Sequence, residues 1–343
     1  MAPWPGAPGA EMHLTVRWAT AARMPWAPKG FTLGCEQFAV EGRPAPTKVR
    51  PAETTPAPPP SSAARHLGGF TPLGFTPTVF RALTDNDGIA AGWMRGLNGS
   101  LARWVDDLGL DRCTWNSDDG LLQPAADVAP LQVAATLSDA GGGWQRLVVD
   151  FVLPAELADP PRLGVTWELP ASLEYLEFFA DGPLDCYPDR RSGAVAGRWR
   201  STVSEQYVDY GMPQEHGHHT GLRWVAVRTR RDGPGLLVVA GPSRAHREPG
   251  VAGVGFSARH HSDAELFSAM HTGDLTPLGD AAATWLSVDV AQRGLGQSSL
   301  GAEAFEAYRI PAGRHRLDLL LANLGGPRSR HTDPAALYAQ RPR

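Results

Sequence analysis

LQVAATLSDAGGGWQRLVVDFVLPAELADPPRLGVTWEL, residues 131–169, is the stretch that decides the fold. Three segments in it, at 131–137, 144–153 and 164–169, alternate apolar and polar side chains or stay apolar for a few residues, as β-strands do. Turns rich in Gly, Asp or Pro separate them, and Pro154 ends the second segment because proline cannot donate to a strand ladder. The stretch therefore predicts short strands joined by tight connections.

The rest of the sequence adds a few helices and further strands. A helix is predicted at 97–108, where apolar side chains recur on one face, and a second after Ser262, which fits a capping box with Glu265. Further strands are predicted at 223–229, 235–240, 254–258, 283–290 and 315–321. Many short strands and few helices predict a mainly β protein, a large antiparallel β-sandwich with one or two short helices.

The β pattern does not extend over the whole chain. Residues 68–322 are predicted to form the sandwich, and 323–343 a flexible tail. Two strands are predicted near the N-terminus, MHLTVRW and GCEQFAV, in a segment (1–42) too small to be a stable domain. The segment 43–67 is rich in Pro, Ala, Ser and Thr and is predicted to be a disordered linker, because it has little apolar surface to bury.

Composition excludes several classes of function. The 343 residues carry a net charge of -4 and no block of Lys and Arg, so we expect no binding to nucleic acid. The longest apolar runs are far shorter than the roughly 20 residues of a membrane-spanning helix, which predicts a soluble protein without membrane contact. The N-terminus has no signal-peptide pattern, so the expected location is the cytoplasm. Three cysteines without a CxxC pair argue against a disulfide framework or a zinc site.

Loop-like sequence with an unusual density of aromatic and charged residues runs from 182 to 223. Pro188 and Pro213 break regular structure there, and polar groups on loops are often functional. It is equally open that 182–223 is a long, well-packed loop with a purely structural role. Within it, Asp189 can pair with Arg190 and Arg198, firstly as a packing contact and secondly as a clamp on a substrate.

The run 215–219, Glu-His-Gly-His-His, is the strongest candidate for chemistry. Imidazoles beside a carboxylate can bind a metal or move protons. On a strand, however, His216 and His218 share one face while His219 takes the other, and no further ligands are evident, so no metal site is predicted. Hydrogen-bonded histidines of a loop or core, and contacts with the hydroxyls of a sugar, are the remaining interpretations.

Two other motifs resemble known binding loops without completing them. The run Asp85-Asn86-Asp87-Gly88 is similar to the start of a calcium loop, but the closing glutamate is missing, so a turn is predicted. The glycine-rich run 294–301, which includes Gln297 and Ser298, lacks the lysine of a phosphate-binding loop and is interpreted as a shaped loop of the sheet.

Several of these motifs together resemble the C-terminal domain of glycoside hydrolase family 2 β-galactosidases. FRALTDND (80–87) resembles the family's WRAPTDND, GPLDCYPDR (182–190) resembles GPGENYPDR, and the Gly197-Arg198-Trp199 and MPQEHG (212–217) segments resemble the family's GRW and MPQENG. The runs 256–261 and 294–296, with His271 between them, follow in the family's order. The resemblance covers about 68–321, and the strands before it resemble the tail of the family's preceding immunoglobulin-like domain.

The resemblance implies a galactose mutarotase-like sandwich and a role in cleaving terminal β-galactosides. The family's two catalytic carboxylates and its metal ligands lie on a (β/α)8 barrel that this chain lacks, so no catalytic residue, metal or cofactor is expected here. The implied partners are a β-galactoside or galactose and either a barrel-bearing chain or further copies of this one. The candidates for carbohydrate contacts are Glu215, His216, His218, Gln297 and Ser298. The signature residues expected to be structural are Arg81, Asp85, Asn86, Asp87, Tyr187, Asp189, Arg190 and Trp199.

The chain also departs from the family pattern. Leu300 stands where some members place a sugar-contacting tryptophan, and Asp185 and Cys186 replace a Glu-Asn pair. Phe80 replaces a tryptophan and Leu83 a proline, which fits a divergent chain or a decaying gene fragment. Three hypotheses follow: the small subunit or C-terminal portion of a β-galactosidase; a free-standing aldose mutarotase, in which Glu215 would act with His216 or His218; and a non-catalytic interaction module.

Overall fold

The computed structural model describes residues 11–40, 70–88, 99–241, 253–297, 303–325 and 333–342. The chain divides into two compact units, residues 1–65 and 66–343, which are treated separately. The predicted linker at 43–67 lies outside the described residues, as do Ser298 and Leu300.

The first unit contains one antiparallel hairpin. Its strands are β1 (Met12–Ala19) and β2 (Thr32–Val40), in a register that places Leu14 opposite Phe38. Both strands were predicted from the alternation of apolar residues. Their origin as a remnant of an immunoglobulin-like domain stays a prediction.

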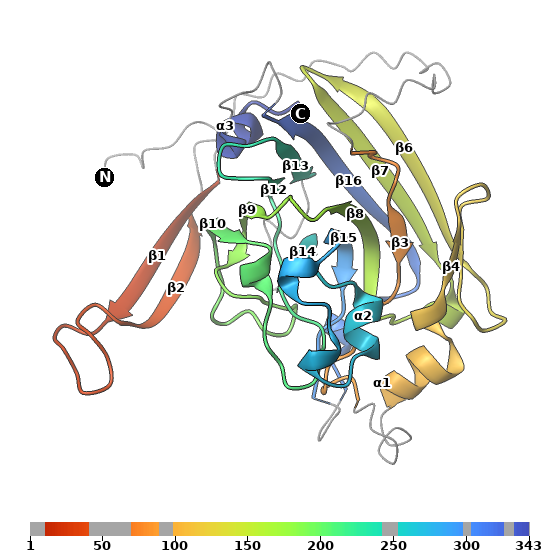
Figure 1. Cartoon of the computed structure of the whole chain (residues 1–343), viewed down its shortest axis with the longest axis horizontal. Helices are drawn as coiled ribbons and strands as arrows, with labels where there is room; N and C mark the ends of the chain where they lie inside the picture. Colours follow the sequence, from red (N-terminus) through yellow and green to blue (C-terminus); the bar gives the residue numbers. More distant parts are fainter. Residues whose placement is uncertain are drawn as a thin grey trace. The chain divides into compact units, whose positions relative to one another are not determined.

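The second unit contains a large sheet of nine strands in the order β10-β9-β12-β13-β16-β7-β6-β5-β4 (Figure 1). All of its pairings are antiparallel, as the short connections in the sequence predicted. The strands are β4 (Thr114–Asn116), β5 (Leu121–Gln123), β6 (Leu131–Gly141), β7 (Trp144–Leu153), β9 (Tyr175–Gly182), β10 (Val195–Thr202), β12 (Trp224–Arg228), β13 (Gly235–Ala240) and β16 (Gly313–Leu324).

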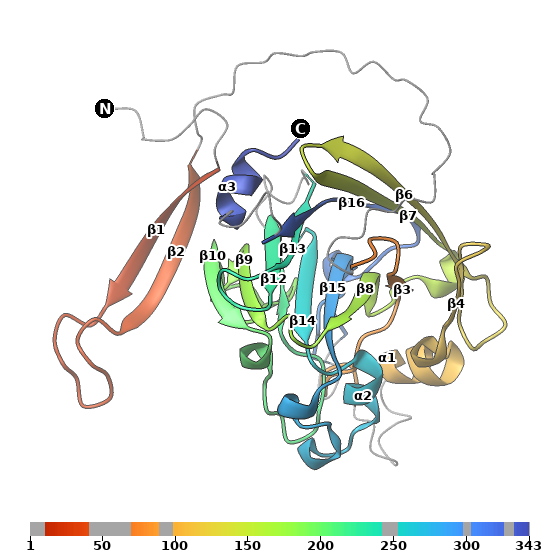
Figure 2. The ribbon, with the colours of Figure 1, turned by 45° about the horizontal axis from the view of Figure 1, so that its top comes forward.

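A smaller sheet of five strands, ordered β11-β14-β15-β8-β3, forms the second layer. Figure 2 shows β14, β15 and β8 side by side in this layer. Its pairings are also antiparallel. The strands are β3 (Thr76–Thr78), β8 (Arg162–Pro170), β11 (His218–His219), β14 (Gly255–Arg259) and β15 (Ala283–Gln292).

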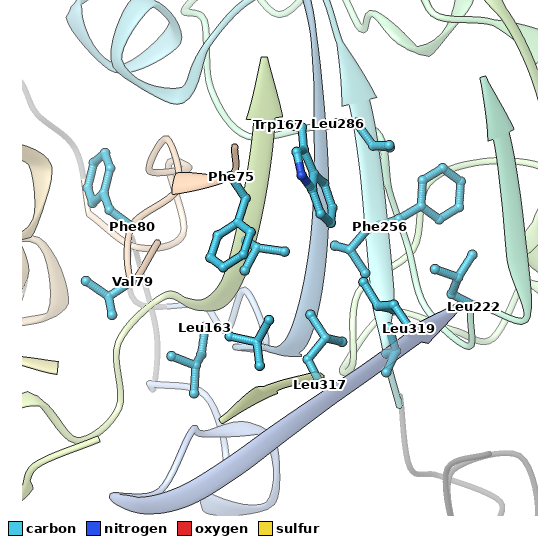
Figure 3. Packing of buried hydrophobic residues seen from close by; sticks show 14 of the residues in the cluster. Phe75, Val79, Phe80, Leu163, Trp167, Leu222, Phe256, Leu286, Leu317 and Leu319 are labelled. Carbon is cyan, nitrogen blue, oxygen red and sulfur yellow. The ribbon is translucent and has the colours of Figure 1, made fainter. Parts of the chain in front are cut away.

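The core lies between the two sheets (Figure 3). Leu317 and Leu319 of β16 meet Leu163 and Trp167 of β8 within one buried cluster, and the Trp167 indole donates to the Pro72 carbonyl at 3.1 Å. Because both layers supply alternate residues to one apolar core, the fold is the predicted large antiparallel β-sandwich.

Helices are few and short. The first is α1 (Gly99–Leu101), which continues as a wider π-helical turn over Ala102–Asp107 and buries Trp104, as the predicted stripe requires. The second is α2 (Asp263–Ser268), capped by Ser262, whose hydroxyl accepts from the Glu265 amide. Single 3-10 turns occupy Leu110–Arg112, Ala155–Leu157, Ser204–Gln206, Thr272–Asp274, Leu278–Asp280 and Glu306–Tyr308.

Two local predictions differ from the structure. The Glu265 carboxylate does not complete a capping box with Ser262; it accepts instead from the Thr276 amide at 2.8 Å, because the following loop folds back onto the helix. The predicted flexible tail holds the end of β16 and the helix α3 (Pro334–Ala339). Leu337 and Tyr338 of α3 pack on the face of the large sheet that points away from the core, and this apolar contact holds the helix in place.

Candidate functional site: a buried charge cluster

Charged side chains lie on the face of the small sheet that points away from the core. Arg162 of β8, Arg259 of β14 and Asp289 of β15 occupy alternate positions to the core residues of their strands, and the pairing of these strands brings them together. The loops that carry the family-like motifs cover this face. The result is a cluster of acidic and basic side chains that is almost entirely shielded from solvent.

Glu215 lies at the centre of this buried charge cluster. Its carboxylate accepts from Nη1 of Arg259 at 2.8 Å and from the Tyr187 hydroxyl at 3.4 Å, and lies 3.8 Å from Nη2 of Arg162. The side chains of Glu215 and Arg162 are 0% exposed. A carboxylate so enclosed is held by its charge partners and has no open side for a ligand.

Asp263, at the start of α2, bridges two of the arginines. Its oxygens lie 2.6 Å from Arg162 and 2.6 Å from Arg259. Burial disfavours its charged form, but the two guanidinium groups more than offset this and hold the pKa of Asp263 below its usual value. The helix is thereby fixed to the small sheet.

Asp289 is the least satisfied member of the cluster. It lies 3.2 Å from Nε of Arg162, and neither of its oxygens accepts a hydrogen bond of good geometry from the described part of the chain. Burial, which the neighbouring Arg162 only partly offsets, raises the pKa of Asp289 to about 7.

Arg81 and Asp87 explain the 80–87 motif. Two parallel bonds of 2.7 and 3.1 Å join the guanidinium to the carboxylate, and both side chains are 0% exposed. Asp87 also accepts from the amide of Thr84 at 2.8 Å and from its hydroxyl at 2.9 Å. Burial lowers the pKa of Arg81, but Asp87 raises it further than burial lowers it, so the guanidinium group stays charged. The Asp-Asn-Asp-Gly run is the predicted turn.

The three adjacent histidines are buried and neutral. Burial lowers the pKa of His216 to about 4, with a further contribution from Arg259, and lowers that of His219 to about 4. Burial also lowers the pKa of His218, which stacks on Tyr187 at 5.5 Å and lies 3.5 Å from Asp289. His219 takes the opposite face and stacks on Phe256 of the core, as the strand alternation predicted. Among the described residues no group of three or more His, Cys, Asp or Glu could hold a metal.

Asp189 connects two motifs that are far apart in the sequence. Its carboxylate accepts from the amides of Leu295 and Gly296 at 3.0 and 2.8 Å. A side chain at Gly294 would meet the Asp189 carboxyl carbon at 2.8 Å, so glycine is needed there. The predicted ion pair of Asp189 with Arg190 and Arg198 is wrong for Arg198, which pairs with Glu177 and Asp333 instead.

Trp199 explains the Gly-Arg-Trp motif. Its indole donates to the Ala180 carbonyl at 3.2 Å, and the ring lies across two glycines of β9 and β10. A Cβ atom at Gly182 or Gly197 would approach the ring to 2.7 or 2.8 Å. The motif is therefore a packing unit that joins two strands.

The structure brings the candidate sugar-binding residues together only in part. Glu215, His216 and His218 lie in or beside the buried charge cluster, at 2% exposure or less. Gln297 is exposed and lies beyond the Asp189-bound loop, while Ser298 is outside the described residues. Asp85 lies at the surface, where its amide donates to Gln214 at 3.3 Å, and Arg190 closes a turn with Tyr187. Carbohydrate binding by these residues stays a prediction.

Sequence reasoning missed four members of the cluster, which are Arg162, Arg259, Asp263 and Asp289. One signal was available, because a charged residue inside an apolar strand segment, such as Asp289 in TWLSVDV, needs a buried partner. The identity of that partner could not be found from the pattern, since Arg162 lies more than a hundred residues away in the chain.

The buried charge cluster can fix loops to the sheet, but it does not offer an accessible acid, base or nucleophile. Retaining glycoside hydrolysis needs two carboxylates on either side of an open sugar site. The carboxylates of this cluster are instead held by arginines.

Among the described residues, no helix is long and apolar enough to cross a membrane.

Comparison with known proteins shows which family this sequence is similar to. The family model described as "Beta galactosidase small chain" matches residues 65–321, more than half of the chain. A β-galactosidase of Arthrobacter sp. (strain B7) is 28% identical over 335 residues, which cover 88% of this chain and 32% of that protein. β-Galactosidase BgaC of Bifidobacterium adolescentis is 29% identical over 246 residues, covering 68% of this chain and 22% of its own length. The chain thus spans a third or less of these curated relatives.

A solved structure, a putative aldose 1-epimerase from Escherichia coli K12, is similar at 13% sequence identity and a TM-score of 0.28, covering 62% of this chain and 67% of the other. A score this low carries no argument about fold or activity.

Proposed function

This chain belongs to the β-galactosidase small chain family, and we propose that it completes a β-galactosidase whose catalytic barrel is carried elsewhere. The observation that supports the proposal is the family match over 65–321, which covers the sandwich up to the last residues of β16. Every strand pair among the described residues is antiparallel, whereas a (β/α)8 barrel is built from parallel strands. The carboxylates that act on the glycosidic bond, and any metal ions, would then belong to the partner.

Complementation tests this function. The Arthrobacter relative would be prepared without the region that aligns with 65–321 and mixed with the purified chain. We expect hydrolysis of o-nitrophenyl β-galactoside only in the mixture. We also expect a complex of the two proteins on a sizing column. As a control, the same relative would be mixed with the isolated hairpin unit (1–65), which is expected to restore nothing.

Two results would contradict the proposal. Hydrolysis by the chain alone, with or without added magnesium, would mean that the catalytic groups are in this chain. Failure of the mixture both to form a complex and to hydrolyse the substrate would remove the role as a partner. Carbohydrate binding by the chain is a separate part of the proposal, and calorimetry with galactose measures it on the chain and on the complex.

The alternative of an independent aldose mutarotase has less support. Its candidate acid and base, Glu215 with His216 or His218, are buried, and Glu215 is held by Arg259 while Nδ1 of His216 is bonded to the Gln214 carbonyl. Polarimetry on fresh α-galactose is expected to show no acceleration by the chain. The cytoplasmic location expected from the sequence stays a prediction, which cell fractionation with an antibody to the chain would test.

A further inference from the structure

A small pocket lies apart from the buried charge cluster. It has a volume of about 160 Å³, enough for several water molecules. None of its lining residues takes part in the charge cluster. They are Ser100, Arg103, Trp104, Asp159, Arg293, Glu303 and Arg309.

Arg293 lines this pocket and is buried. Its Nε donates to Asp159 at 2.8 Å and its Nη2 to Glu303 at 2.7 Å, while the guanidinium carbon lies 4.9 Å from the centre of the Trp104 ring. The residue is 1% exposed. Its Nη1 has no hydrogen-bond partner in the described part of the chain.

The planar geometry of the guanidinium group decides which acceptors the unpaired Nη1 can still reach. Nε and Nη2 form one side of the planar fork, which the two carboxylates occupy, so the Nη1 end with its two N–H donors is left for another acceptor. A buried donor without a partner destabilises the fold, because its lost hydrogen bond to water is not replaced. An acceptor that enters the pocket and bonds Nη1 removes that cost.

Asp159 fixes Arg293 in this position. Its backbone has a φ of 59°, in the left-handed region that few residues other than glycine adopt. The conformation is held by its amide, which donates to Ile310 at 2.7 Å, and by its carbonyl, which accepts from the Trp104 indole at 2.8 Å. Uncommon backbone conformations held in this way concentrate at ligand sites.

The charges around the pocket favour an anion. Three guanidinium groups line it, of Arg103, Arg293 and Arg309, against the two carboxylates of Asp159 and Glu303. Arg309 is 41% exposed, and within the described ranges its one close bond runs from Nε to the Ala304 carbonyl at 2.9 Å. Its terminal nitrogens can therefore meet a ligand that enters from solvent.

We propose that this pocket binds a small oxyanion, a carboxylate or phosphate, between Nη1 of Arg293 and the side chains of Arg309 and Arg103. Planar and tetrahedral oxyanions match the fork geometry of arginine, and charge-assisted bonds of this kind are the strongest in proteins. The site does not depend on β-galactosidase activity.

Thermal unfolding of the full chain tests the site, with sodium phosphate and sodium acetate titrated against sodium chloride at constant ionic strength. A bound anion raises the unfolding temperature with its concentration. We expect this rise in the wild-type chain for at least one of the two anions. Which anion acts separates a phosphate from a carboxylate ligand, and either result supports the site.

Substitutions of the three arginines test whether the anion binds in this pocket. Arg309→Gln and Arg103→Gln are on the rim, so each is expected to fold and to weaken binding about tenfold or more, because a charge-assisted bond is lost. Arg293→Lys is expected to abolish anion binding, because lysine lacks the Nη1 donor. Arg230→Gln, at an exposed position in the β12–β13 turn, is the matched control and is expected to bind like wild type. Absence of any rise beyond chloride, or an equal rise in the Arg309→Gln and Arg103→Gln variants, overturns the proposal.

Discussion

At the scale of single residues, the buried charge cluster depends on the balance between burial and pairing. Arg81, Arg162 and Arg259 pair with Asp87, Glu215, Asp289 and Asp263, and these side chains are buried apart from that of Asp263, which is 16% exposed. Such groups stabilise a fold only while every partner is present, and removal of one charge typically costs about 3–5 kcal/mol. The cluster therefore gives the charged residues of the motif loops a structural role, which is to hold these loops on the small sheet.

Asp289→Asn makes a prediction about pH. The folded pKa is raised to about 7, whereas the unfolded value is about 3.9. Between these values the unfolded chain has lost the proton that the folded chain keeps. The contribution of Asp289 to stability is therefore complete below about pH 4 and is lost as the pH rises through about 7. The variant cannot titrate, so its stability relative to wild type is expected to rise over this window, at about 1.4 kcal/mol per pKa unit.

Urea unfolding at a series of pH values measures this difference. His216 and His219, with pKa values of about 4, have the opposite pH dependence, but they are present in both proteins and cancel in the comparison. Asp150→Asn, on the half-exposed side of β7, is the control for replacing a carboxylate outside the charge cluster. Parallel curves for Asp289→Asn and wild type would show that Asp289 is ionised throughout.

At the scale of elements, α3 shows how a short helix is held by its cap and by one apolar face. Asp333 accepts from the Ala335 amide at 3.1 Å and pairs with Arg198 of β10 at 2.7 Å. Leu337 and Tyr338 cover Trp224, Leu237 and their neighbours on the large sheet. A helix of this length is not stable alone, so both contacts are needed.

Asp333→Ala is expected to destabilise α3 by about 1 kcal/mol, because the N-cap is lost. Faster hydrogen exchange of the amides at 335–340, with little change in the rest of the chain, would be the signature. Asp333→Asn is the matched control. It keeps the cap and loses only the charge pair with Arg198, which is half-exposed and worth little, so it should behave nearly as wild type. Equal effects of Ala and Asn would assign the stability to the ion pair instead.

At the scale of the molecule, the sandwich contains its own core. All residues of the main apolar cluster lie between Phe70 and Leu321, and both sheets are built from residues of the second unit. Among the described residues, those of the first unit supply no strand to these sheets and no member of this cluster. The sandwich therefore has what a domain needs to fold by itself.

A chain that begins at His66 is expected to fold. Its circular dichroism should be that of a β protein, and its unfolding should be a single transition at nearly the temperature of the full chain. Deletion of 303–343, which removes β16 from the middle of the large sheet, is the comparison expected to abolish folding. Loss of the transition in the His66 chain would show that the first unit is needed for the sandwich.

Much of this fold and part of the site could be predicted from the sequence. The strands were predictable because alternation of apolar residues is a local property. The segments predicted at 144–153 and 164–169 correspond to β7 and β8. The turn at 85–88 and the opposite faces of His218 and His219 were predictable for the same reason. The helix at 334–339 was not, because its stability comes from the sheet that it covers.

Tertiary structure alone decided what the charged residues do. Asp189 was expected to pair with nearby arginines, yet it binds amides more than a hundred positions away. Glu215 and the adjacent histidines have the composition of an active site, and only the pairing of β8, β14 and β15 shows that arginines enclose them. The sequence determined the sandwich, since local periodicity sets which face of each strand is apolar. The pairing of strands decided the charge cluster, because a buried charge takes its partner from whichever residue the fold brings within a few ångströms.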